Sequence, residues 1–150
     1  MIRRQKAAAV AAAAIAIGAG AYWWWIGRAP RIDAGDPQVV AAGAAIYQAQ
    51  CARCHGAELE GQPDWRSPLA NGRLPAPPHD ESGHTWHHPD DVLVKIVKEG
   101  PDFYATLGVQ TDMPSFGSTL SDQDIAAVVS FIKSRWPPAI QARQARTNGQ

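Results

Sequence analysis

Two thiols and an imidazole lie together in the segment Cys51-Ala52-Arg53-Cys54-His55. Cys-x-x-Cys-His is the pattern that attaches haem covalently. Two thiols three residues apart on one turn can each add to a haem vinyl group, and the adjacent imidazole then lies against the iron. Because Cys51 and Cys54 are the only cysteines of the chain, the segment predicts one covalently bound haem c, with His55 as an iron ligand.

Three other uses of a cysteine pair fit this sequence less well. A thioredoxin-type redox centre accompanies a βαβ pattern, which the sequence lacks. A tetrahedral zinc site needs further ligands at a second cluster, and only histidines remain to supply them. A simple disulfide between the two cysteines would not enlarge the hydrophobic core, which is small when it is formed by short helices alone. A haem would enlarge it. The haem interpretation is therefore favoured.

The second iron ligand is predicted to be Met113, which is the only methionine besides the initiator. A thioether opposite an imidazole raises the reduction potential of the iron and suits electron transfer. Methionines more often fill gaps in a core, but Pro114 stiffens a polar loop here, which is a poor place for a gap-filling side chain. We expect His55 and Met113 to ligate the iron. A haem with two histidine ligands, one of them from the loop described next, stays an alternative.

A histidine-rich loop covers residues 75–89, PAPPHDESGHTWHHP. Histidine is the commonest metal ligand, so a second metal, copper especially, is one interpretation. The favoured one is that these side chains form hydrogen bonds with the haem propionates and the loop backbone, since no helical ligand spacing fixes their geometry. The histidines concerned are His79, His84, His87 and His88.

Three amphipathic helices are predicted to position these residues. Their starts carry capping residues or first-turn acids, their apolar residues recur on one face, and proline or glycine ends the second and third. They are expected to run from Asp36 to Cys51, from Pro89 to Gly100 and from Ser121 to Pro137. Residues 62–88, between the first two predicted helices, contain five prolines and no sustained periodic pattern of apolar residues. A loop of that length needs something large to order it, and a haem would do so.

The N-terminal part is predicted to be a membrane anchor. A basic stretch at residues 1–6 precedes 21 uncharged residues at 7–27, enough to cross a hydrocarbon core of about 30 Å. Tyr22 to Trp25 would lie at the interface, and the basic residues favour a cytoplasmic N-terminus. A cleaved secretory signal ending near Ala21 is the alternative. Both interpretations export the domain.

Charge is unevenly distributed along the chain. Fourteen basic and fourteen acidic side chains cancel overall, yet residues 36–137 carry a net charge of −6. A global basic surplus, typical of nucleic-acid binders, is absent, and an acidic domain favours basic partners. We expect residues 28–35 to be a tether, 36–137 to be one domain and 138–150 to be a disordered tail.

The segment from Asp36 to Pro137 resembles the class I cytochromes c. The order of first helix, CARCHG, proline-containing loop, middle helix, MPSF and last helix is similar. The resemblance implies an all-α cytochrome c fold, in which short helices pack around one covalently bound haem. It also implies that Pro77 or Pro78 holds the proximal imidazole and that Trp86 lies near a propionate. The first and last helices would cross at small and aromatic residues, namely Gly43, Tyr47, Val128 and Phe131.

The function expected from these features is electron transfer without catalysis. Iron with two protein ligands leaves no open position for a substrate, so no small-molecule substrate is expected, and neither is nucleic acid. The partners would be the lipid bilayer and membrane-bound or periplasmic redox proteins, with the haem domain on the periplasmic side of a single-pass inner-membrane anchor. The alternative is a haem-bearing subunit of a larger membrane redox complex, whose other spans would pack against small residues of the anchor.

Overall fold

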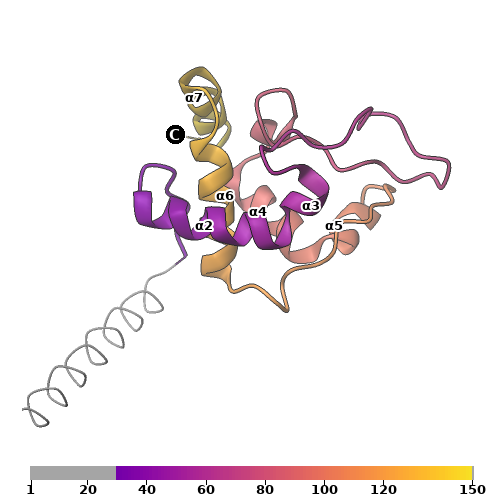
Figure 1. Cartoon of the computed structure of the whole chain (residues 1–150), viewed down its shortest axis with the longest axis horizontal. Coiled ribbons are helices and arrows are strands. Elements are labelled where there is room, and N and C mark those ends of the chain that lie inside the picture. The colour runs from indigo at the N-terminus through magenta and orange to yellow at the C-terminus, as the bar shows by residue number, and fades with distance from the viewer. Residues whose placement is uncertain (1–29, 150) are drawn as a thin grey trace, which may run out of the picture. The chain divides into compact units, whose positions relative to one another are not determined.

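The computed structural model describes residues 30–149, which are helical and contain no strand. The all-α prediction is therefore confirmed for this part of the chain. The elements are α2 (Pro37–Gln50), α3 (Ala52–His55), a 3₁₀ turn η1 (Thr85–His87), α4 (Asp90–Glu99), α5 (Pro101–Ala105), α6 (Asp122–Ser134) and α7 (Pro138–Thr147) (Figure 1). The predicted basic stretch 1–6 and anchor 7–27 lie outside the described residues. Within the described residues, no helix is both long and apolar enough to cross a bilayer.

The caps expected from the sequence start the first and last of the predicted helices. The Asp36 carboxylate accepts hydrogen bonds from the backbone N–H groups of Gln38 and Val39, at 2.9 and 3.3 Å. At α6, the Ser121 hydroxyl accepts from the Asp124 N–H at 3.2 Å, and the Asp124 carboxylate accepts from the Ser121 N–H at 3.0 Å. Side chains thus satisfy backbone donors that a helix start would otherwise leave unpaired.

Helices α2 and α6 cross (Figure 1), and their closest approach is at Gly43, as the resemblance implied. A Cβ atom on Gly43 would lie 1.9 Å from the carbonyl oxygen of Ala127 and 3.0 Å from the Cβ of Phe131. One turn later, the fully buried Tyr47 ring packs against Phe131 with a centroid distance of 5.3 Å. The crossing is so close that only glycine fits. The surrounding core comprises Tyr47, Leu59, Trp86, Leu93, Val128, Val129, Ile132 and Trp136.

Replacing Gly43 by alanine is therefore expected to destabilise the fold. Forced overpacking typically costs roughly 1–3 kcal/mol, which outweighs the gain of about 1 kcal/mol that alanine offers over glycine in a helix. Urea unfolding of the holoprotein, followed by far-UV circular dichroism, measures the change. A Gly43→Ala variant more stable than the parent would contradict the close crossing.

The disordered tail expected at 138–150 is a wrong prediction, because residues Pro138–Thr147 form α7. Proline at its first position suits a helix start. The Gln144 side chain is completely buried and donates hydrogen bonds to the carbonyl of His88 at 3.2 Å and the Asp90 carboxylate at 2.7 Å. Polar contacts hold this helix, so its sequence lacks the apolar periodicity by which the others were recognised.

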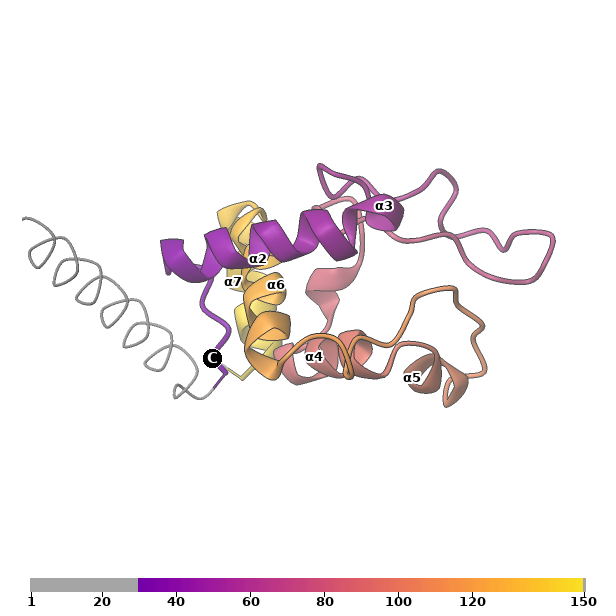
Figure 2. The same cartoon turned by 60° about the horizontal axis from the view of Figure 1, so that its bottom comes forward.

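Two long loops leave the helical body on the same side (Figure 2). One follows α3 and the other follows α5, and an ion pair between Arg73 and Asp112 joins them. The second loop is anchored to α4, because the backbone N–H groups of Phe116 and Gly117 donate to the carbonyls of Val97 and Lys98, each at 3.1 Å. These contacts fix both ends of the segment that carries Met113.

Candidate functional site

The cysteines and His55 lie on one short helical turn directly after α2. Cys51 lies between α2 and α3 and caps both helices, and its N–H donates to the Tyr47 carbonyl at 2.8 Å. The His55 N–H in turn donates to the Cys51 carbonyl at 3.0 Å. Both thiols are free and partly exposed. The turn therefore presents two thiols and an imidazole together, as the spacing predicted.

The Cys51 thiol is poorly suited to redox catalysis of its own. Burial, followed by the neighbouring Cys54, raises the pKa of the Cys51 thiol to about 11. A redox-active Cys-x-x-Cys pair works through a thiolate, which a lowered pKa provides. The structure thus disfavours the thioredoxin-type alternative on chemical grounds.

His55 is oriented by a proline carbonyl. Its ring is buried, and Nδ1 lies 2.8 Å from the carbonyl oxygen of Pro77. Because a carbonyl only accepts, Nδ1 carries the proton and the lone pair of Nε2 is left for a metal. Burial lowers the pKa of His55, with the Pro77 bond acting in the opposite direction, so the ring is neutral. Of the two prolines considered from the sequence, Pro77 makes this contact.

A second layer of side chains supports the His55 ring. His79 stacks on it with a centroid distance of 4.0 Å and an interplanar angle of 21°. The His79 Nδ1 lies 2.8 Å from the Thr85 hydroxyl, and the Trp136 indole N–H donates to the His79 carbonyl at 2.7 Å. Burial, then the proximity of His55 and His84, holds the pKa of His79 well below its ordinary value. His79 thus packs as a neutral ring behind His55.

Tyr47 ties this turn to α2. Its hydroxyl donates to the carbonyl of Gly56 at 3.0 Å, directly after His55. Burial above all raises the pKa of Tyr47 far above its ordinary value, and the nearby Cys51, Glu60 and Asp80 act in the same direction. The hydroxyl therefore remains a donor at any physiological pH.

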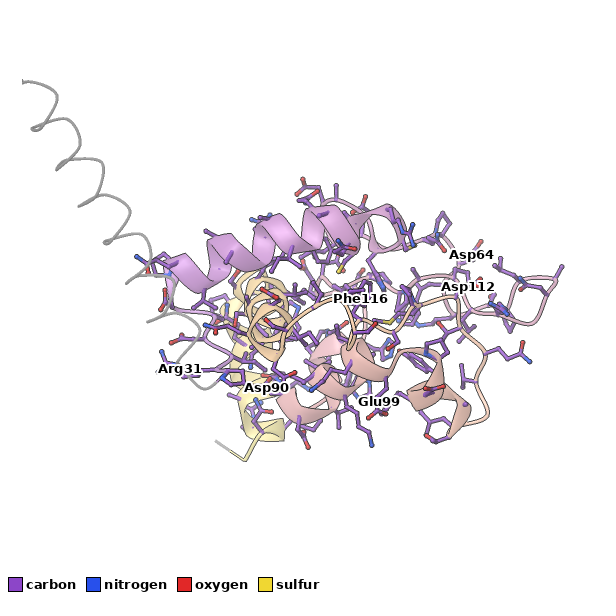
Figure 3. The ribbon with its side chains drawn as sticks, turned by 90° about the horizontal axis from the view of Figure 1, so that it is seen from below. Arg31, Asp64, Asp90, Glu99, Asp112 and Phe116 are labelled. Carbon is purple, nitrogen blue, oxygen red and sulfur yellow. The ribbon has the colours of Figure 1, made fainter. Side chains whose placement is uncertain are left out.

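Met113 lies in the loop between α5 and α6, between Asp112 and Pro114. Its side chain is partly buried and its N–H donates to the Thr111 hydroxyl at 3.0 Å. Gly100, at the end of α4, has φ +51°, and a Cβ atom there would lie 2.7 Å from the Pro114 carbonyl carbon. This close approach fixes the residue after Met113. Figure 3 labels Asp112 and Phe116, which lie on either side of it in the sequence.

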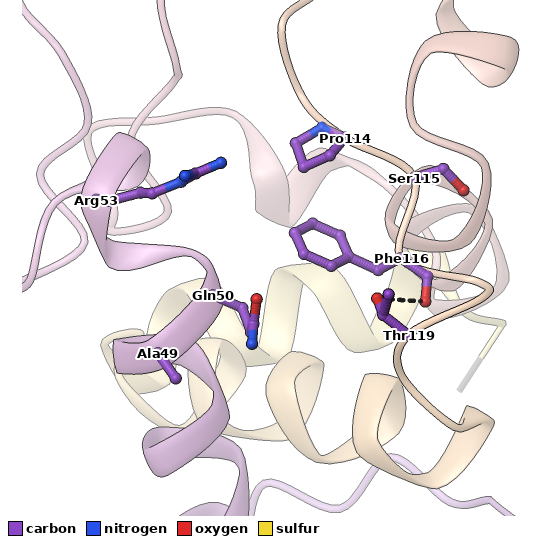
Figure 4. A pocket seen from close by; sticks show the side chains of 7 residues that line it. All are labelled: Ala49, Gln50, Arg53, Pro114, Ser115, Phe116 and Thr119. Atoms are coloured by element: carbon purple, nitrogen blue, oxygen red, sulfur yellow. Dashed lines mark hydrogen bonds between the residues drawn. The ribbon is translucent and has the colours of Figure 1, made fainter.

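A cavity of about 320 Å³ separates the cysteine segment from the methionine loop (Figure 4). Gln50 and Arg53, which flank Cys51, line one wall, and Pro114, which follows Met113, lines the other. Ligand sites commonly begin at about this volume. The side chains of Cys51, Cys54, His55 and Met113 do not line this cavity, but its walls come from the two segments that carry them. Two thiols and a neutral imidazole on one segment and a thioether on the other are the groups that a covalently attached haem requires. The full lining is Ala49, Gln50, Arg53, Pro114, Ser115, Phe116 and Thr119.

The remaining loop histidines pack against aromatic rings. His84 stacks on Trp65 with centroids 5.1 Å apart, and His88 meets His84 edge-on at 5.4 Å. His87 stacks on Trp86 at 3.7 Å. In residues 30–149, no group of three or more His, Cys, Asp or Glu side chains could hold a metal ion. The copper interpretation therefore gains no ligand set from the described part of the chain.

Sequence reasoning missed the contribution of the C-terminal residues to this loop. The Arg143 guanidinium carbon lies 4.6 Å from the centroid of the Trp86 ring, on which His87 also stacks. Lys133 and Gln144 both bind the carboxylate of Asp90, two residues after His88. Pro138 is the one signal in the sequence for this helix, because proline is favoured at the first position of a helix.

Comparison with known proteins agrees with this geometry. A family model described as cytochrome c matches residues 40–136, which is more than half of the chain. The matched range begins in α2 and ends just before α7, so it contains the cysteine segment, the histidine-rich loop and the methionine loop. Searches of the curated proteins and of the solved structures found no match.

Proposed function

This chain belongs to the cytochrome c family, as a class I member that carries covalently attached haem c, and we propose that it is a one-electron carrier whose iron is ligated by His55 and Met113. Cys51 and Cys54 would form the thioether bonds. When bound, the haem supplies a one-electron Fe(III)/Fe(II) couple.

The observation that carries the proposal is the hydrogen bond between His55 Nδ1 and the Pro77 carbonyl. It fixes the tautomer and the ring orientation of a buried imidazole, as second-layer partners of metal-bound histidines do. The stacked His79 ring restricts rotation of His55 further. These contacts would hold Nε2 in one position as a ligand for the iron of a bound haem.

The ligand from Met113 supports a carrier over an enzyme. If Met113 and His55 both ligate the iron of a bound haem, they would leave no coordination position open for a substrate, oxygen or peroxide. The loop is anchored directly after Met113, where Pro114 lies against Gly100 and the Phe116 N–H donates to the Val97 carbonyl, and this would restrict the positions open to the thioether. Electrons would enter and leave through the haem without a bound substrate.

We further propose that residues 7–27 anchor the protein in the inner membrane, with the haem domain on the periplasmic side. The length of this uncharged stretch supports a membrane span. The basic residues before it support an orientation with the N-terminus in the cytoplasm. Tethering would raise the effective concentration of the domain near membrane-bound donors and acceptors. The net charge of −6 over residues 36–137 favours a basic docking face on those partners.

Two measurements on the full chain, matured in a host that attaches haem c, test this function. A spectroelectrochemical titration is expected to give a reversible one-electron transition, and added peroxide is expected to give no turnover. Sustained peroxide turnover by the intact protein would refute the carrier role.

Two further experiments test the location and the assembly of the chain. Before treatment, the haem domain is expected to sediment with the spheroplast membranes, and an external protease is expected to degrade it. Purification in mild detergent with a stoichiometric partner would favour a subunit of a larger redox complex.

A further inference from the structure

One buried polar atom near the site has no partner. The Nδ1 atom of His84 is inaccessible to solvent, and no group in residues 30–149 forms a hydrogen bond with it. An unsatisfied buried imidazole nitrogen is unfavourable, and native proteins usually pair such atoms with protein, water or a ligand. The missing partner must therefore be a group other than the described residues.

The surroundings of His84 indicate the charge of that partner. Trp65 covers one face of the ring, and the Arg66 guanidinium carbon lies 4.0 Å from the Trp65 ring centroid. Burial lowers the pKa of His84 most, and His88, His87 and Arg66 lower it further. The neighbouring groups that act on His84 are thus all cations or imidazoles. Such an environment suits an anionic acceptor.

The position of His84 links it to the iron ligand. His79 stacks on His55, and His84 lies close enough to His79 to lower its pKa. The intervening backbone is held firmly, because the Thr85 hydroxyl contacts the His79 ring at 2.8 Å and a Cβ atom on Gly83 would lie 2.0 Å from the Pro78 carbonyl oxygen. His84 thus lies in the same loop as His79, the residue that stacks on His55, and contacts within that loop restrict its backbone.

We propose that His84 donates a hydrogen bond from Nδ1–H to a propionate carboxylate of the haem. The carboxylate supplies the anionic acceptor that the orphaned nitrogen lacks, and the hydrogen bond is charge-assisted. The inference needs the haem c that the family binds but does not depend on the proposed role in electron transfer. The proposal gives His84 a contact with the cofactor. It gives no such contact to His87, which therefore can serve as a control.

Nuclear magnetic resonance of the reduced holoprotein, labelled with ¹⁵N-histidine, tests the contact directly. We expect a slowly exchanging His84 Nδ1–H proton with a nuclear Overhauser effect to the methylene protons of one propionate. A rapidly exchanging proton without that effect would show that a buried water, or nothing, occupies the place, and would overturn the proposal. The measurement uses the parent protein, so it does not depend on whether a variant folds.

Variants provide a second, independent readout. Asparagine carries an N–H donor near the position of Nδ1, whereas phenylalanine retains the ring without a donor. Loss of the donor leaves propionate charge uncompensated and favours Fe(III), so His84→Phe is expected to lower the midpoint potential and His84→Asn to preserve it. His87→Gln, at a neighbouring exposed ring, is the matched control and is expected to leave the potential unchanged. Equal potentials for His84→Phe and the parent would contradict the contact.

Discussion

Replacing Met113 by alanine is expected to remove the weak far-red band of the oxidised spectrum and to lower the reduction potential. The band arises from thioether–iron ligation, and a thioether opposite an imidazole raises the potential. Axial ligands move haem potentials over a range of about 0.8 V, so we expect a fall on the order of a few tenths of a volt. Absorbance spectroscopy and a spectroelectrochemical titration measure the two effects.

A pair of companion variants makes this result specific. Met113→His would retain two protein ligands and low-spin iron, yet its potential should also fall because the thioether is gone. Ser118→Ala changes an exposed side chain of the same loop and should leave both the band and the potential unchanged. If the parent lacks the far-red band and Met113→Ala keeps the parent's spectrum and potential, Met113 is not the ligand, and the alternative with a second histidine takes its place.

Replacing both Cys51 and Cys54 by alanine is expected to abolish covalent haem attachment and most of the cooperative fold. A cavity of about 320 Å³ lies between the junction of α2 and α3 and the loop after Met113, and the cofactor is expected to occupy it. Cofactor binding to the folded state contributes its free energy to stability. Haem staining after denaturing electrophoresis reports attachment, and far-UV circular dichroism reports the loss of helix.

The chain offers a matched control for the double variant. Ala57 lies two residues after His55 and is exposed, so Ala57→Ser should retain attachment and helix content. Each single cysteine variant should keep one thioether bond and therefore stain for haem more weakly than the parent. Stable, haem-stained protein from the double alanine variant would contradict attachment through these two thiols.

The local signals in the sequence were sufficient for the helices that carry the site. Asp36 and Ser121 are caps whose chemistry is independent of distant residues, and the structure shows both in use. The close crossing at Gly43 followed from the resemblance, and its neighbours on α6 confirm it. The two caps depend only on residues within one turn of the helix start. The crossing at Gly43 depends on distant residues, but the family resemblance implied it.

Features that depend on distant partners were harder to predict. Pro77 and Pro78 are adjacent, and only the fold decides which carbonyl faces His55. Helix α7 is held by Gln144, whose partners His88 and Asp90 lie more than fifty residues earlier in the sequence. A hydrophobic pattern cannot reveal a helix whose buried side chain is an amide. For the same reason, the packing of the loop histidines against Trp65 and Trp86 became visible only in three dimensions.

We propose that one haem c is held between His55 and Met113 with no open coordination position. Absorbance spectra of the matured, full-length protein, oxidised and reduced, with and without added imidazole, test this ligation. We expect a sharp α-band in the reduced state, a weak far-red band in the oxidised state and no change on addition of imidazole. A high-spin spectrum that shifts readily with imidazole would show an open iron site and would contradict the carrier function.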